Sequence, residues 1–417
     1  MLRRCYVLFI LMIAYACAYL DRSVIGIVLP QLKHEFNFGD VGLGFLSGLA
    51  FAAFYVFFGL PAAALADRGN RRNLIVVAIA VWSVMTGLCG LAGNFLQLAL
   101  ARVGVGAGEG GLSPPAQSII SDLFPHQRRA TALSVYSVGI YIGILIGLAL
   151  GGYITEHFGW RQTFFVMAIP GIVVSIVFAL TVREPQRGEG EIHTDEGQGH
   201  RSFLEVLRFL WVTPALRYTL IGITLCSMFT QTQGAWLPSF LVRSHHMTIG
   251  QAGLMLGVTT ATGGGLGIVI GGILSDRLGA RDPRWRIWVV TAAFMVLPLS
   301  ALAFLYSDDA NVIAAMAFAN SFLAAVHLAP TSAVTQNLTP PRMRARAVAV
   351  TLFLTSLVGG GFGPLLIGAL SDYLRRYAGP DALRYALTSL SAFALAAAAS
   401  YFAAGFRMPA ADSEARL

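Results

Sequence analysis

Four charged side chains stand inside long apolar stretches of the chain: Asp21, Arg22, Arg102 and Glu109. A charge at membrane depth is costly, and such residues usually mark proton relays or substrate sites. Arg102 and Glu109 are seven residues apart, so both project from one face of a helix. Burial disfavours the charged form of a carboxylate and a nearby arginine favours it, so an acid between these effects can change its protonation as helices move. The four residues predict a proton-coupling and substrate-binding cluster; the alternative is a static ion network that joins two helices.

The depth of these residues predicts how they pair. At a rise of about 1.5 Å per residue, Asp21 and Arg102 lie in the outer halves of their helices and Glu109 lies nearer the middle. We expect Asp21 to pair with Arg102 or Arg22, and Glu109 to lie one or two turns deeper, facing the same cavity. Protonation of either acid would free an arginine to hold an anionic group of the substrate.

Other polar residues are weaker candidates for the same cavity. His327 is titratable, but a single histidine in an apolar stretch is more often a packed, hydrogen-bonded residue. For the remaining candidates, packing and interfacial anchoring explain the residue type equally well. The candidate cavity-lining residues are Tyr136, Tyr141, Gln231, Gln233, Trp236, Asn320 and His327.

No pattern for catalysis or metal binding accompanies these residues. The sequence has no HExxH or GxSxG motif and no cluster of histidine and cysteine at metal-ligand spacing. Its four cysteines all lie inside apolar runs without a CxxC spacing, which is typical of small packing residues. We expect no catalytic residues, no metal and no cofactor, and we do not expect an enzyme.

The composition requires a membrane. Of the 417 residues, 56% are hydrophobic and 12% are charged, whereas soluble domains carry about 25% charged residues. So much apolar surface exceeds what one buried core holds. The net charge of +8 does not indicate nucleic acid, because the basic residues form short clusters between apolar runs.

Apolar runs of spanning length, about 20 residues, predict twelve transmembrane helices. Asp40 is a candidate cap for the second span, and Thr248 with Gln251 forms a capping box before the eighth. The N-terminus resembles a cleavable signal peptide, but its apolar stretch continues to Pro30, which favours a first span. The predicted spans lie near 5–29, 41–66, 73–92, 95–123, 130–154, 163–182, 216–241, 250–274, 286–306, 311–336, 346–370 and 384–406.

The basic residues orient these spans. With both termini in the cytoplasm, most of the 29 lysine and arginine residues fall on the cytoplasmic side, as the positive-inside rule requires. Residues 183–215 form the one long polar insertion, with a flexible linker and then a short surface helix over 202–211. We predict an all-α membrane protein with an N-terminal six-helix bundle (1–182), a cytoplasmic linker (183–215) and a C-terminal six-helix bundle (216–417).

The fourth span contains a GxGxxG match at Gly106, Gly108 and Gly111. A dinucleotide site needs this pattern between a strand and a helix, whereas here it lies inside an apolar run. Glycines at small-xxx-small spacing instead let helices approach closely. The adjacent pair Pro114-Pro115 then breaks the helix, and broken helices recur at transporter sites.

Charged loops recur six spans apart. One follows the second span and its counterpart follows the eighth, so the chain is internally duplicated, as in transporters built from two moving halves. An acid at the end of one span can accept hydrogen bonds from the N-terminus of a neighbouring helix. We interpret the loops as a cytoplasmic latch; plain positive-inside anchoring would explain the arginines but not the repeated Asp-Arg. The latch residues are Asp67, Arg68, Arg71 and Arg72 in the first copy, and Asp276 and Arg277 in the second.

At these loops the chain resembles the major facilitator superfamily, whose signature is G-x-x-x-D-R-x-G-R-R. Ala63 and Asn70 replace two of its glycines, and the D-R-x-N-R form resembles the spinster branch. The resemblance covers essentially the whole chain. The other residues that carry it are Asp21-Arg22, the segment from Arg102 to Pro125, Gly159-Trp160-Arg161 and Arg183-Glu184-Pro185.

This resemblance implies a secondary transporter that works by alternating access. The spinster branch implies an amphipathic lipid substrate, such as a lysophospholipid or a sphingoid phosphate, and it points to Asp21, Arg22, Arg102 and Glu109. The alternative is a proton-linked carrier of a small organic anion. We expect a monomer in the bacterial inner membrane, with its substrate, protons and membrane lipids as partners and no nucleic acid.

Overall fold

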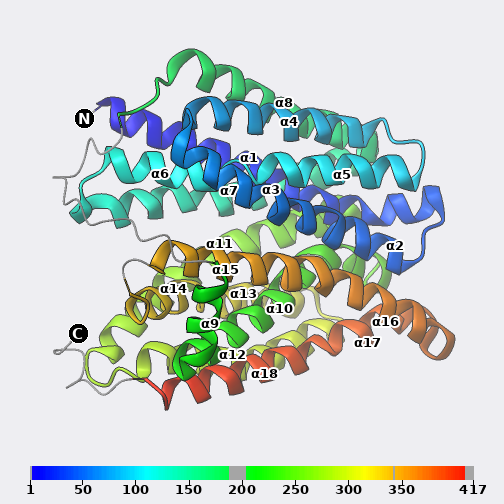
Figure 1. The fold of residues 1–417 in the computed structure, drawn as a ribbon. Coiled ribbons are helices and arrows are strands. Elements are labelled where there is room, and N and C mark those ends of the chain that lie inside the picture. The colour runs from blue at the N-terminus through cyan, green and yellow to red at the C-terminus, as the bar shows by residue number, and fades with distance from the viewer. Residues whose placement is uncertain (1, 187–202, 341–342, 409–417) are drawn as a thin grey trace. The chain divides into compact units, whose positions relative to one another are not determined.

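The computed structural model describes residues 2–186, 203–340 and 343–408. These residues form helices joined by short connections and contain no strand. Helices suit such a chain because they satisfy every backbone hydrogen bond within one segment. Figure 1 shows the helices, which are α1 (Leu2–Phe36), α2 (Asp40–Gly44), the π-helical turn η1 (Phe45–Leu49), α3 (Ala50–Arg68), α4 (Arg71–Gly90), α5 (Phe95–Glu109), α6 (Ser113–Leu123), α7 (His126–Phe158), α8 (Trp160–Thr181), α9 (Phe203–Val212), α10 (Pro214–Ser244), α11 (Ile249–Gly279), α12 (Trp285–Tyr306), α13 (Ala310–Ala325), α14 (Leu328–Asn337), α15 (Arg344–Leu354), the π-helical turn η3 (Thr355–Phe362), α16 (Gly363–Ala378), the 3-10 turn η4 (Gly379–Asp381), α17 (Ala382–Thr388) and α18 (Leu390–Gly405).

The twelve predicted spans all correspond to helical segments. Within the described residues, nine segments are long and apolar enough to cross a membrane, or ten if the bent pair α9–α10 is counted as one. The last segment, Arg346–Gly405, is a 60-residue run that covers both the eleventh and the twelfth predicted span. The fourth span is divided between α5 and α6, and neither helix alone is long enough to cross a membrane. The fold class of an all-α membrane protein is confirmed.

The described chain separates into two compact units. The first contains the described residues from 2 to 186, together with Gly234–Val258 and Pro364–Asp372. In it, α1 packs on α7 and α8, α4 packs on α8, and α5 packs on both α3 and α4. The charged residues of the first predicted cluster all lie in this unit, on α1 and α5.

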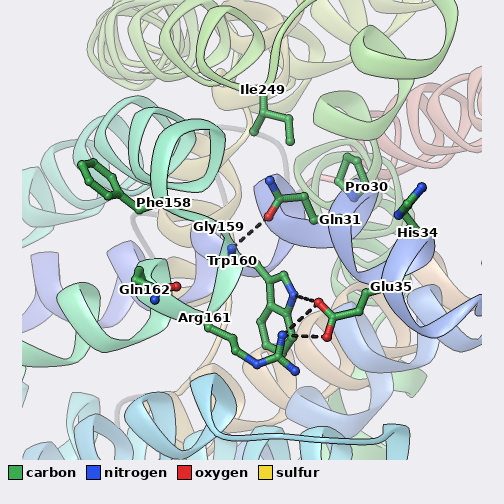
Figure 2. A pocket seen from close by; sticks show the side chains of 10 residues that line it. All are labelled: Pro30, Gln31, His34, Glu35, Phe158, Gly159, Trp160, Arg161, Gln162 and Ile249. Carbon is green, nitrogen blue, oxygen red and sulfur yellow. Dashed lines mark hydrogen bonds and ion pairs between the residues drawn. The ribbon is translucent and has the colours of Figure 1, made fainter.

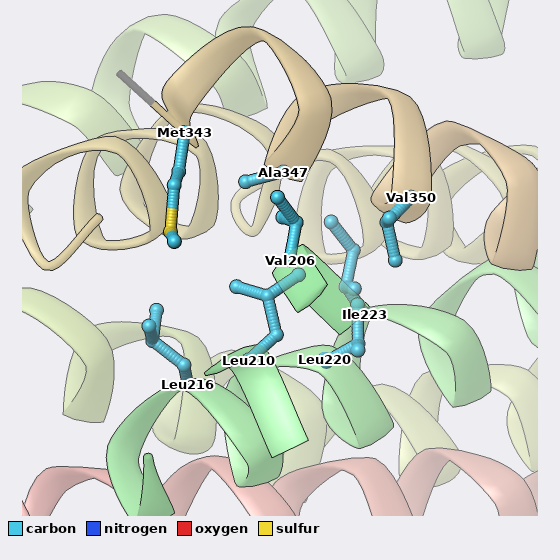
Figure 3. Close-up of a cluster of buried hydrophobic side chains, with 8 residues drawn as sticks. All are labelled: Val206, Leu210, Leu216, Leu220, Ile223, Met343, Ala347 and Val350. Atoms are coloured by element: carbon cyan, nitrogen blue, oxygen red, sulfur yellow. The ribbon is translucent and has the colours of Figure 1, made fainter. Parts of the chain in front are cut away.

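The second unit contains the remaining described residues, including Thr259–Gly363. In it, α12 packs on α13 and α18, and α15 packs on α9. The predicted short helix over 202–211 is present as α9, which meets α10 at a bend of 101°. Val206 and Leu210 of α9 are buried against α10 and α15, beside residues such as Leu220 and Val350 (Figure 3).

These units differ from the predicted division at 182 and 216 in two places. Gly234–Val258 and Pro364–Asp372 group with the N-terminal residues, although they come from the second half of the sequence. The two-bundle division therefore stays a prediction about how the chain works. The linker predicted before α9 falls largely outside the described residues.

Candidate functional site

The fourth span is interrupted beside its acidic residue. α5 ends at Glu109 and α6 begins at Ser113, and hydrogen bonds from Gly111 N to Gly108 O and from Leu112 N to Glu109 O close the turn between them. Proline occupies the first turn of α6, where the backbone N–H groups have no helical partner and proline is tolerated. The break predicted at this position is confirmed. It leaves Glu109 as the last residue of α5.

The glycines of α5, and Gly110 directly after it, bring two helices close to this site. A methyl group added at Gly106 would overlap the carbonyl oxygen of Phe51, and one at Gly110 would lie 2.6 Å from the carbonyl oxygen of Tyr55, both on α3. On the other side, one added at Gly108 would lie 2.7 Å from the backbone nitrogen of Trp82 on α4. The prediction that these glycines serve helix packing is confirmed, because α3 and α4 both contact α5 where it has no side chains.

The ionisable residues of α1 and α5 come together inside the first unit. Asp21, Arg102 and Glu109 are buried, each with at most 3% of its surface exposed. The Arg22 Nε atom lies 2.5 Å from a Glu109 oxygen and forms an ion pair with it. Asp21 instead accepts a hydrogen bond of 3.0 Å from the Thr86 hydroxyl on α4.

Asp21 therefore forms no ion pair with either predicted arginine, although the charge of Arg102 acts on it electrostatically. Arg22 extends from α1 to Glu109 at the end of α5, so the arginine next to Asp21 in sequence neutralises the other acid. The reason is direction: neighbouring residues on a helix project to different sides. Asp21 reaches α4 and Arg22 reaches α5.

Three atoms of this cluster are buried without a hydrogen-bond partner in the described part of the chain. They are Oδ1 of Asp21, Oε1 of Glu109 and Nε of Arg102. A buried polar atom left unpaired costs about 1–3 kcal/mol, so native structures rarely keep one without a functional reason. The two free carboxylate oxygens are suited to take a proton, and the free guanidinium nitrogen is suited to bind an anion.

Aromatic rings surround the Arg22 side chain. Its guanidinium carbon lies 4.9, 5.0 and 4.6 Å from the ring centres of Tyr19, Phe51 and Tyr55. The Phe51 ring also lies 5.2 Å from the guanidinium carbon of Arg102. The sequence reasoning missed these rings. The missed signal is the spacing of four residues between Phe51 and Tyr55, which places both on one face of a helix beside the charged helices.

The predicted cavity-lining residues divide into packed and exposed groups. In the first unit, Tyr136 is buried and stacks on Tyr15 with ring centres 4.2 Å apart. In the same unit, the Trp236 indole donates to the Pro364 carbonyl. Tyr141 is half-buried on α7.

In the second unit, two of these residues have internal partners. The Asn320 side-chain oxygen accepts a hydrogen bond from Ser300, and the buried His327 ring bonds the Ala324 carbonyl oxygen. Gln231 is exposed and Gln233 is half-buried.

The first predicted latch loop contains a buried ion network. Arg71 is 1% exposed, forms ion pairs with Glu184 and Asp122, and donates to the Ser118 hydroxyl at 2.9 Å. Arg72 donates its backbone N–H to Glu184. This network joins the start of α4 to the ends of α6 and α8.

The other latch residues are less engaged. Arg68 is exposed at the end of α3, and Asp276 and Arg277 are exposed at the end of α11. The side chain of Asp67 lies outside the described residues. The latch predicted at Asp67 therefore stays a prediction.

A third buried acid, missed as a site by the sequence reasoning, is Asp40, the first residue of α2. Asp40 accepts hydrogen bonds from Lys33, from Arg243 at 2.9 and 3.0 Å and from Ser371 at 2.7 Å. It does not cap its own helix as predicted, because the carboxylate of Asp372 accepts the backbone N–H groups of Asp40 and Val41. All of these residues belong to the first unit.

A similar contact forms at the start of α11. Glu156, near the end of α7, accepts the backbone N–H of Gly250 at 2.7 Å. The predicted capping box is confirmed there by reciprocal bonds between Thr248 and Gln251. Two helix N-termini in the first unit are thus held by acids from other helices, where the helix dipole favours a negative charge.

A surface pocket of about 620 Å³ lies at the junction of α1, α7 and α8 (Figure 2). Gln31 accepts the backbone N–H of Trp160, and the Glu35 carboxylate bonds both the Trp160 indole and Arg161. These bonds fix the sharp turn at Gly159, whose φ of 88° suits glycine. None of the ionisable residues of the cluster lines this pocket.

Comparison with known proteins places the chain in a family. The model of the Major Facilitator Superfamily matches residues 11–364, with a second match over 219–416. The chain is 33% identical to an MFS-type efflux pump of Mycolicibacterium smegmatis over 93% of this chain and 90% of that protein. It is 30% identical to human protein spinster homolog 1 over 86% of this chain and 71% of that protein.

The fold agrees with this assignment. A crystal structure of a bacterial homolog of the human lysosomal transporter Spinster, in an inward-facing and unoccupied conformation, matches with a TM-score of 0.88. The match covers 97% of both chains at 28% identity. The chain belongs to the major facilitator superfamily and is a spinster-like transporter.

Proposed function

We propose that this protein is a proton-coupled secondary transporter of the bacterial inner membrane that moves an amphipathic lipid by alternating access. The substrate is a lysophospholipid or sphingoid phosphate, whose anionic head group binds at the arginines of α1 and α5. The observation that carries this proposal is the pair of arginines in one buried site, where Arg22 forms an ion pair with Glu109 and Arg102 forms none within the described part of the chain. Within the described residues, no hydrogen bond or ion pair to the Arg102 side chain is found, so its charge is available to an anion.

The proton acts on the ion pair of Glu109 and Arg22. When Glu109 is charged, it holds Arg22 through its Oε2 atom while Oε1 stays unpaired. A proton on Glu109 removes its charge and weakens this contact, since charge-assisted hydrogen bonds are about twice as strong as neutral ones. Arg22 then joins Arg102 in holding the anionic group. Asp21, paired with a hydroxyl rather than a cation, is the second acid able to take a proton.

Access to this site alternates through closing contacts at both ends of the helices. At the cytoplasmic end, Asp67 holds the N-terminus of the eleventh span and the buried Arg71 network keeps the loop in place. At the opposite end, Asp40 and Glu156 bind Arg243 and Gly250 from the second half of the sequence, and Asp372 from that half binds the backbone of Asp40. The two six-helix bundles rock as the contacts at one end open and those at the other close, and the protein works as a monomer with both termini in the cytoplasm.

A small organic anion is the second candidate substrate. The same two arginines suit a compact carboxylate, because a guanidinium binds carboxylate and phosphate oxygens with the same geometry. The similarity to an efflux pump favours export in either case. What separates the candidates is whether an acyl chain is required.

Flux into proteoliposomes tests the proposal. Purified protein is reconstituted, and uptake of oleoyl-lysophosphatidylglycerol is compared with uptake of malate, with and without an imposed pH gradient. Lysolipid uptake driven by the gradient and abolished by Arg102→Ala supports the proposal. Gradient-driven malate uptake without lysolipid uptake would replace the lipid by the small anion, and lysolipid uptake that ignores the gradient would remove proton coupling.

A further inference from the structure

A single aromatic ring contacts both arginines of the site. The centre of the Phe51 ring lies 5.0 Å from the guanidinium carbon of Arg22 and 5.2 Å from that of Arg102. Both distances fall within the range of a cation–π contact, about 6 Å. The two arginines come from different helices, α1 and α5, and the ring comes from a third, α3. One side chain therefore links the two cations that the proposed substrate would meet.

The backbone leaves this ring little freedom to move. The carbonyl oxygen of Phe51 lies against Gly106 of α5, and that of Tyr55 lies against Gly110. Tyr55 also stacks on Phe51, with ring centres 5.6 Å apart and planes 20° apart. Helix contact on one side and ring stacking on the other hold Phe51 where it meets the arginines.

The two arginines depend on this ring to different degrees. Arg22 also has its ion pair with Glu109 and contacts with Tyr19 and Tyr55. Arg102 is 1% exposed, and its Nε atom is buried without a partner. Among the described residues, the Phe51 ring is the cation–π partner found for the Arg102 guanidinium.

We infer that Phe51 is a positioning residue, which holds the Arg22 and Arg102 guanidinium groups in place for one anionic head group. The negative face of the ring stabilises both cations in addition to the buried acids of the site. When Arg22 leaves Glu109, the ring still contacts it, so the released arginine stays beside Arg102. This inference rests on the proposed function, because it deepens the account of the same site.

The transport test compares two substitutions of the ring. Phe51→Leu keeps an apolar side chain but removes the aromatic face, and Phe51→Tyr keeps the face. Phe57→Leu, an exposed phenylalanine on the same helix, is the matched control. In proteoliposomes with oleoyl-lysophosphatidylglycerol, Phe51→Leu should raise the half-saturation concentration about 5- to 30-fold and shift the pH profile. Phe51→Tyr and Phe57→Leu should stay within about 2-fold of the wild type, below the effect of one cation–π contact.

Two results would overturn the inference. Phe51→Leu with wild-type half-saturation and pH profile would show that the ring does not position the arginines. An equal rise of the half-saturation concentration in Phe51→Tyr and Phe51→Leu would show that the exact packing matters and the aromatic face does not.

A measurement without substrate keeps this inference separate from the proposed function. Thermal unfolding in detergent is measured for Phe51→Leu, Arg102→Gln and the double variant. If the ring and the guanidinium interact, Phe51→Leu should lower the melting temperature less in the Arg102→Gln background than in the wild type. Additive losses would overturn the inference even if lysolipid transport is found. Non-additive losses would support it even if the protein carries malate.

Discussion

Glu109 and Asp21 are both buried acids, but their partners give them different roles. Glu109 binds a cation through Arg22, whereas Asp21 accepts one hydrogen bond from Thr86. Removing a charge that is paired with a cation leaves that cation uncompensated. Removing a charge that accepts a bond from a hydroxyl weakens that hydrogen bond, because the asparagine oxygen still accepts it. The two neutral variants should therefore differ in stability.

Glu109→Gln should destabilise the protein by about 1–3 kcal/mol. This is less than the full cost of breaking a buried ion pair, because the Arg22 side chain is 21% exposed and its charge is partly solvated. Asp21→Asn should cost about 0.5–1.5 kcal/mol. Thermal unfolding in detergent measures both. Equal losses, or a larger loss for Asp21→Asn, would contradict the observed pairing.

The same variants test proton coupling. Asp21→Asn and Glu109→Gln should each still bind substrate but lose the response of transport to a pH gradient, because neither amide takes up a proton. Arg102→Ala should weaken substrate binding about 10- to 150-fold, as expected for loss of a charge-assisted hydrogen bond. Flux at several pH values in proteoliposomes measures all three. If Asp21→Asn keeps its full pH dependence, Asp21 belongs to a static network.

Among the elements, α5 determines how closely its neighbours approach. Its glycines face α3 on one side and α4 on the other, and this contact places Phe51 and Tyr55 beside the arginines. In an ordinary helix, replacing glycine by alanine is favourable by about 0.5–1 kcal/mol. At Gly106 the new methyl group would collide with rigid backbone, so the sign should reverse.

Gly106→Ala should destabilise the protein by about 1–3 kcal/mol, the usual cost of overpacking, and should reduce transport. Gly87→Ala on α4 is the control, since its added methyl group would lie 3.7 Å from Ala168, an ordinary contact. Melting temperatures in detergent compare the two. A neutral or stabilising Gly106→Ala would mean that α3 can retreat from α5 without cost.

Helix ends carry the contacts that we assign to closure. Asp40 lies 3% exposed between Lys33 and Arg243. Asparagine at this position would leave two cations without their shared acid. The cost should be about 1–3 kcal/mol, since both cations keep partial contact with water.

Asp40→Asn should also favour opening at this end of the helices. Spin labels are placed at the exposed positions Asn94 and Asp309, and the exposed Cys5 is replaced by serine. Double electron–electron resonance should then show a longer distance component in Asp40→Asn than in the wild type. Asp282→Asn, which changes a half-buried acid in another loop, should leave the distances unchanged. Identical distance distributions for Asp40→Asn and the wild type would remove Asp40 from the closing contacts.

For the whole molecule, the distribution of basic residues predicts the orientation in the membrane. Single cysteines at Asp308 or Asp309 should react with an impermeant reagent added outside intact cells. Cysteines at positions 190–198 should react only after the membrane is opened. The opposite pattern would reverse the proposed topology and place both termini outside the cell.

The sequence by itself determined the features that depend on local physics. Hydropathy predicted the twelve spans, Pro114-Pro115 predicted the break between α5 and α6, and the glycine spacing predicted close helix packing. Each is a property of one segment or of neighbours along a helix. The cost of a charge in an apolar run likewise identified Asp21, Arg22, Arg102 and Glu109 as candidate site residues.

Only the tertiary structure decided which of these residues meet. Arg22 bonds Glu109, 87 residues away, and Asp40 bonds Arg243, 203 residues away. Periodicity says which face of a helix a side chain occupies, but the rotation and neighbours of that helix depend on packing against the others. For the same reason, the ring of Phe51 between two arginines was invisible in the sequence, because its position follows from the contact of α3 with the glycines of α5.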